Sequence, residues 1–175
     1  MPHIRRLSVT CMNVQALEEL FEAMPNIEEL NLSIVESYPL ETVNLLKVPK
    51  TLDKLHIECG KIECRDRSTE ITFETIQTLL KAFDNQLLSL TLIMINPAKD
   101  FSNFVKVQSL VSDFTRLESF QYFIKTIHQP NSQSDFPNVK VLPDSSYSLF
   151  TLPKPRPFDT ISERFDLDSR LTFKR

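Results

Sequence analysis

The apolar and polar positions along the chain follow an eight-residue pattern that occurs five times, and the five copies align with one another without gaps. Each copy is apolar at positions 1, 4, 6 and 8, whereas positions 5 and 7 are mostly polar. The copies begin at Ile4, Ile27, Leu52, Leu87 and Leu117. Because successive side chains of a strand point to opposite faces, this alternation predicts a half-buried strand in each copy.

Between these strands the apolar residues change to a helical spacing of three and four. Asn13 and Thr72 are candidate N-caps for the first two helices, and the third apolar series follows Ser102. Leu40, Val43 and Leu46 predict a shorter turn before Pro49. The three series are Val14, Leu17, Leu20, Phe21 and Met24; Phe73, Ile76, Leu79, Leu80 and Phe83; and Phe104, Val107, Leu110, Val111 and Phe114.

A weaker sixth copy, Val139-Lys-Val-Leu142, follows Pro-Asn as the second copy does. Measured between fourth positions, the steps are 23, 25, 35, 30 and 22 residues. The third step is long because of a charge-rich insertion at 60–71, which we expect to be a surface loop, and 128–138 predicts another loop. A strand–helix unit cannot bury its apolar face alone, so stacked units with a curved parallel sheet inside and helices outside are expected.

The sequence resembles the leucine-rich-repeat family over residues 2–142, through the L-x-x-L-x-L core of Leu30/Leu32, Leu55/Ile57 and Leu90/Leu92. The copies are irregular, like those of F-box/leucine-rich-repeat and ribonuclease-inhibitor-like proteins. The phrase Met24-Pro-Asn-Ile-Glu-Glu-Leu-Asn-Leu looks like the repeat region of F-box substrate receptors, although these 175 residues contain no recognisable F-box. The sequence departs from the family at the usual Asn/Cys position, which holds Met12, Val35, Gly60, Ile95 and Lys125.

We therefore expect an α/β leucine-rich-repeat solenoid of about five to six irregular repeats. Residues 1–142 would form the repeat domain, and residues 143–175 a Pro-rich C-terminal cap and tail. The first strand begins close to Met1, so we expect either another chain to cover its edge or further sequence upstream.

The odd positions of the strands should line the concave face and form the partner-binding surface. Arg6, Glu29 and Lys54 alternate in charge and could pair across strands, whereas Ile93 and Phe123 would be an exposed apolar anchor unless the tail or a loop covers them. The candidate binding residues are Arg6, Ser8, Glu29, Asn31, Lys54, His56, Glu58, Thr91, Ile93, Gln121 and Phe123.

Composition narrows the remaining possibilities. The net charge of −3 argues against general nucleic-acid binding, the single glycine, Gly60, excludes Gly-rich phosphate loops, and no apolar run approaches the roughly 18 residues of a membrane span. Cys59 and Cys64 near His56 suggest zinc, but no second Cys/His pair follows. A Cys59–His56 catalytic pair is disfavoured because the two side chains should lie on opposite faces of the sheet.

The expected function is therefore recognition of a partner protein, without catalysis, cofactor or metal. With three cysteines and no export signal, a cytoplasmic or nuclear location is the simplest interpretation. The resemblance implies the substrate-recognition part of a ubiquitin-ligase receptor, which would work with Skp–cullin machinery if a full-length F-box form exists. The alternative is a regulatory scaffold of the ribonuclease-inhibitor type without any ubiquitin role.

Overall fold

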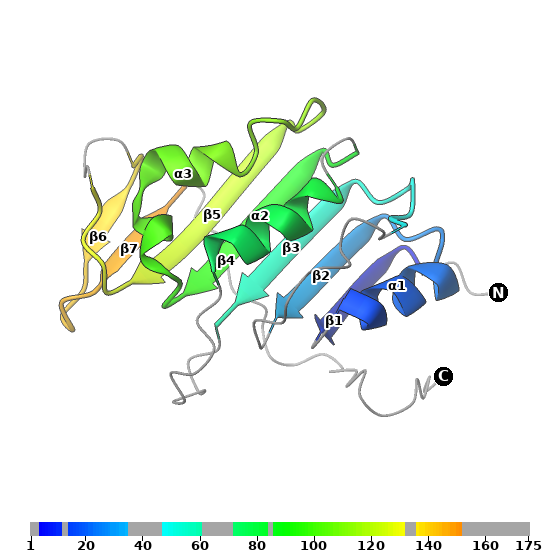
Figure 1. Cartoon of the computed structure of the whole chain (residues 1–175), viewed down its shortest axis with the longest axis horizontal. Helices are drawn as coiled ribbons and strands as arrows, with labels where there is room; N and C mark the ends of the chain where they lie inside the picture. Colours follow the sequence, from blue (N-terminus) through cyan, green and yellow to red (C-terminus); the bar gives the residue numbers. More distant parts are fainter. Residues whose placement is uncertain are drawn as a thin grey trace.

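The computed structural model describes residues 4–11, 14–34, 47–60, 72–83, 86–131 and 136–151. In these residues, seven strands form a single, mostly parallel sheet, and three α-helices lie on one of its faces (Figure 1). The expected α/β class with a parallel sheet is therefore confirmed, whereas the leucine-rich-repeat solenoid stays a prediction.

The strands are β1 (Arg6–Cys11), β2 (Glu29–Ile34), β3 (Lys54–Cys59), β4 (Ser89–Ile95), β5 (Ser119–Thr126), β6 (Val139–Val141) and β7 (Tyr147–Phe150). The helices are α1 (Val14–Ala23), α2 (Phe73–Lys81) and α3 (Phe104–Ser109), and the 3-10 helix η2 (Lys99–Ser102) precedes α3. Of the two expected capping residues, Thr72 accepts a hydrogen bond from the Thr75 amide, and Asn13 lies outside the described residues. Helix α3 is capped by Asn103, which accepts a hydrogen bond from the Lys106 amide. The expected turn at 40–46 also lies outside them.

Strands β1 to β5 are parallel neighbours, and their register follows the sequence pattern without a slip. The fifth-position residues stand opposite one another across the five strands: Ser8, Asn31, His56, Thr91 and Gln121. A one-residue slip would exchange the two faces of a strand, so this register keeps each apolar set on the same side.

A backbone hydrogen-bond motif recurs where each strand begins. The carbonyl oxygen of Arg5 accepts the amides of Glu28 and Glu29, at 2.8 and 2.9 Å. The carbonyls of Glu28, Asp53 and Leu88, at the same position of the next copies, each accept two amides from the following copy at 2.8–3.1 Å. The same backbone geometry therefore joins all five copies.

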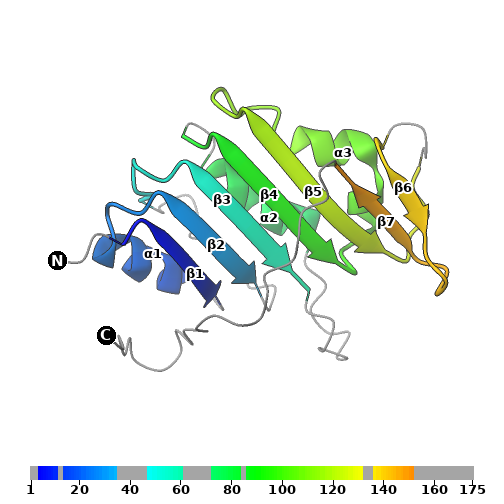
Figure 2. The same ribbon diagram turned by 180° about the vertical axis from the view of Figure 1, so that it is seen from behind.

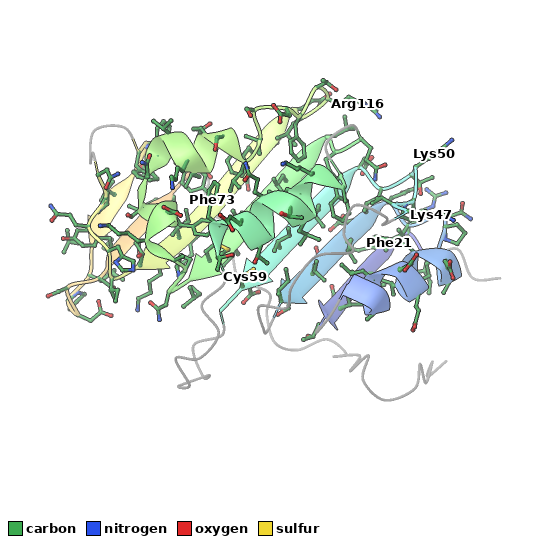
Figure 3. All side chains as sticks on the ribbon, viewed as in Figure 1. Phe21, Lys47, Lys50, Cys59, Phe73 and Arg116 are labelled. Atoms are coloured by element: carbon green, nitrogen blue, oxygen red, sulfur yellow. The ribbon has the colours of Figure 1, made fainter. Side chains whose placement is uncertain are left out.

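The core lies between the sheet and the helices. Its residues at position 6 of each copy are 5% exposed or less, namely Val9, Leu32, Ile57, Leu92 and Tyr122. In Figure 3, Phe21 of α1 and Phe73 of α2 mark the helix layer, and Cys59 lies near the carboxyl end of β3. The labelled Lys47, Lys50 and Arg116 are exposed near the opposite end, where the strands begin. Burial of these apolar faces, at roughly 25 cal/mol per Å², supplies most of the force that holds the two layers together.

The sixth copy differs from the expected arrangement. Val139–Val141 does form a strand, but β7 lies between it and β5, and both contacts of β7 are antiparallel. The two strands form a hairpin whose turn is held by Asp144 Oδ1, which accepts a hydrogen bond from the Ser146 amide at 3.1 Å. Leu149 is fully buried beside Ile124, so β7 continues the core that a sixth parallel strand was expected to cover. The domain boundary at 142–143 stays a prediction.

Candidate protein-binding face

We call the sheet face away from the helices the open face; Figure 2 views the sheet from this side. It is lined by positions 3, 5 and 7 of β1 to β5, because the core contains positions 4, 6 and 8. The register places the eleven candidate residues on adjacent strands of this one face. Arg6, Ser8 and Lys54 are exposed, while Asn31, Thr91 and Gln121 are half-buried.

The β1–β2 part of the face is held by polar contacts. Arg6 Nη2 lies 2.8 Å from Glu29 Oε2, and the Asn31 side-chain amide donates to Ser8 Oγ at 3.0 Å. The expected charge pairing across strands is thus present between Arg6 and Glu29. Their side chains are 71% and 23% exposed, so solvent screens the pair and its effect is to align side chains more than to stabilise the fold.

The position-7 row changes character between β3 and β4. Thr10, Ser33 and Glu58 are polar, whereas Ile93 and Phe123 are apolar and stand opposite each other in the register. Ile93 has no exposed surface, and Phe123 is only 8% exposed. Their burial contradicts the expectation of an exposed anchor and agrees with the alternative that another part of the chain covers the two residues.

The expected C-terminal cap supplies a third member of this apolar row, which sequence reasoning did not assign to the open face. Phe150 of β7 pairs with Phe123 in the antiparallel register, so the row continues from Ile93 through Phe123 to Phe150. The repeat pattern ends at Leu142, so nothing in it places Phe150 beside the fifth copy. The alternation of Tyr147, Ser148, Leu149 and Phe150 is too short and too apolar to show which face each side chain takes.

His56 and Cys59 occupy different environments. His56 is on the open face, where burial lowers its pKa to about 4, so the imidazole is neutral near pH 7. Cys59 is 1% exposed within the core between the sheet and the helices, and burial together with the Glu58 charge raises its pKa. A buried thiol with a raised pKa is a poor nucleophile. The prediction that the two side chains lie on opposite faces is consistent with their positions.

In the part of the chain that the structure describes, no three His, Cys, Asp or Glu residues are grouped closely enough to hold a metal ion. The suggested partner Cys64 lies outside that part, as does the side chain of Cys11. The described helices include none that could cross a membrane.

Comparison with known proteins leaves the fold and the open face as the basis for any assignment. The chain matches no family model, no curated protein and no solved structure.

Proposed function

We propose that this chain is a leucine-rich-repeat-type module that binds a partner protein through its open face. The main support is the common register of β1 to β5 together with the repeated carbonyl motif at each strand entry. Equivalent copies that share one backbone geometry present equivalent side chains at regular intervals, which suits recognition of an extended surface. The described helices all lie on the other face of the sheet (Figure 2).

The contacts in this proposal come from the polar residues of the face. Arg6 and Lys54 offer positive charge on exposed side chains. Glu29 offers negative charge between them, and Glu58 offers it further along β3. Thr91 and Gln121 add neutral hydrogen-bonding groups on β4 and β5. Such a surface favours a polar partner of mixed charge, and complementary charges would set the orientation of binding more than its strength.

The resemblance to F-box receptors extends the proposal to substrate selection for a cullin–RING ubiquitin ligase. This extension rests on family analogy alone, since a fold hosts many functions. The irregular copies fit a ribonuclease-inhibitor-like scaffold equally well, and capture of the Skp adaptor and a cullin with the chain would separate the two. Their absence, together with a specific partner, would favour the scaffold.

The binding face can be tested by site-specific photocrosslinking in the full chain. A crosslinking amino acid at Thr91 or Gln121 should trap a partner protein, whereas the same group at Glu74, exposed on α2, should trap little. The Lys54→Glu variant should lower the yield from Thr91 without changing the melting temperature. Equal yields from Thr91 and Glu74 would contradict contact at the β4–β5 part of the face. If a crosslinking group at exposed Ser8 on β1 also trapped no more than Glu74, binding would not depend on the open face and the proposal would be contradicted.

A further inference from the structure

The burial of Ile93 needs a covering group on the open face. The three described helices all lie on the opposite face of the sheet (Figures 1 and 2). Neighbours in the register, Glu58 and Phe123, can shield the flanks of Ile93 but not its outward end. Ile93 nevertheless has no exposed surface in a single copy of the chain. The atoms that cover Ile93 therefore belong to this chain, and the described helices, which lie on the other face, do not supply them.

The described part of the chain ends beside this apolar row. Phe150 stands opposite Phe123, and the next residue, Thr151, donates its amide to the Tyr122 carbonyl at 3.1 Å. Thr151 Oγ1 also accepts the Tyr122 amide at 3.1 Å. These two hydrogen bonds fix Thr151 against β5, so residues 152–175 continue from a fixed point.

The distance from that point to Ile93 is easily spanned. From β7 to β4 there are two strand spacings, or about 10 Å, and an extended chain covers about 3.3 Å per residue. Roughly three to four residues therefore suffice to reach Ile93. The whole row lies within reach of the first part of the segment.

The chemistry of the segment matches an apolar row. After Leu152, the prolines at 153, 155 and 157 favour an extended backbone and remove amide donors, so this stretch suits lying across a sheet face more than joining its edge. Phe158, Ile161 and Phe165 then bring large apolar side chains. Segment 61–71, which follows the carboxyl end of β3, offers only Ile62 and Ile71 as large aliphatic side chains, so the C-terminal segment fits better than it does. Its charged or hydroxyl residues number eight: Lys61, Glu63, Arg65, Asp66, Arg67, Ser68, Thr69 and Glu70.

We propose that residues 152–165 dock on the open face and cover the apolar row of Ile93, Phe123 and Phe150. The segment would shield the apolar row from water and occupy the β4–β7 half of the face. This inference stands without the proposed protein-binding function. If both hold, a partner that needs Thr91 or Gln121 competes with the chain's own C-terminal segment, whereas one that contacts only β1 to β3 does not.

The test is solvent exposure of the Ile93 δ1-methyl group, measured by NMR with a soluble paramagnetic probe on the full chain. The Ile93→Leu variant assigns the signal. In the variant Phe158→Ser/Ile161→Ser/Phe165→Ser, the relaxation enhancement of this methyl group should rise several-fold towards that of the exposed Val105 methyls. The fully buried Ile57 methyl should not change, which controls for loss of folding.

A matched variant, Ile62→Ser/Ile71→Ser, distinguishes the competing segment. It should leave the Ile93 signal protected. Three results would overturn the proposal: an Ile93 signal exposed already in the unmodified chain, one that stays protected in the C-terminal variant, or one released by the 61–71 variant instead. A signal whose protection falls on dilution of the unmodified chain would point to a second copy as the cover, and would overturn it as well.

Discussion

The two halves of the open face share a backbone plan but differ in side-chain chemistry. In β1 to β3, position 7 carries Thr10, Ser33 and Glu58. On β1, the edge strand of the sheet, Arg6 and Ser8 are exposed. In β4, β5 and β7 the corresponding row carries Ile93, Phe123 and Phe150, and the two residues from β4 and β5 are buried. The first half is the more solvated one, because Arg6, Ser8 and Lys54 are exposed, although Ser33 on β2 is only 9% exposed. The second half behaves as a small additional core.

Register and solvation are therefore set separately in this sheet. The repeated strand-entry hydrogen bonds fix which residues stand side by side, and they do so in both halves. Whether the position-7 row is exposed then depends on whether its side chains are polar or apolar, and on which other part of the chain packs over them. A sheet face can thus extend over many strands in one register while only some of those strands present accessible side chains.

The largest expected effect distinguishes the two position-7 environments directly. Ile93→Ala should lower the free energy of unfolding by about 2–5 kcal/mol, because it removes a fully buried side chain and leaves a cavity. Ser33→Ala, at the equivalent position of β2 and 9% exposed, should cost less than about 1 kcal/mol. Urea denaturation measures both; a cost for Ile93→Ala as small as that for Ser33→Ala would remove the distinction between the halves.

The boundary between the halves has its own weak point at Gly60. Its φ of 79° is in the left-handed region, and a Cβ there would overlap the backbone carbonyl of Ile95 on β4. Gly60→Ala should therefore cost about 1–3 kcal/mol in unfolding free energy. Asn96, at φ 51°, already has a side chain, so Asn96→Ala should cost no more than about 1 kcal/mol. Thermal denaturation of both variants would show whether the overlap, and not the positive φ alone, matters.

A pH effect should come from His56, in the middle of the face. Folding lowers the pKa of this imidazole from 6.5 to about 4, so the unfolded chain binds more protons between these values. Stability contributed by neutral His56 is complete above pH 6.5 and decreases as the pH falls towards 4. The side chain is still partly solvated, so we expect a loss of about 1–2 kcal/mol over this range. Denaturation at pH 7 and pH 4.5 should show a smaller difference for His56→Gln; an unchanged difference would assign the effect elsewhere.

The smallest effect is expected from the exposed pair on the solvated half. A double-mutant cycle with Arg6→Ala and Glu29→Ala should give a coupling below about 0.5 kcal/mol, which decreases further in high salt. A coupling above about 1.5 kcal/mol would show that this half is also shielded from solvent.

Much of the fold is encoded locally enough to be predicted from the sequence. Gapless copies of apolar positions 1, 4, 6 and 8 predict the register that aligns His56 with Asn31 and Thr91. The Thr72 cap and the apolar face of α2 follow from the same short-range rules. The order of β6 and β7 does not, because β7, and not the weak sixth copy that forms β6, pairs with the edge of β5.

The sequence pattern predicts which residues lie on the open face, but not how exposed their side chains are. Strand alternation places Ile93 and Phe123 on this face, and alternation contains no information about what lies above a sheet. Burial there comes from contacts distant in sequence, which a periodic pattern cannot reveal. The neutral state of His56 has the same origin, since desolvation is a property of packing.

The strand-entry hydrogen bonds also bear on how such a chain can change in length. Each of these carbonyl oxygens accepts two main-chain amides of the next copy. Neighbouring strands are therefore aligned at their first residues, by the backbone and not by any particular side chain. Residues added after a strand ends, as in the 35-residue third step, leave this alignment untouched. Connecting segments could therefore lengthen, shorten or gain new chemistry while the neighbouring copies keep their places.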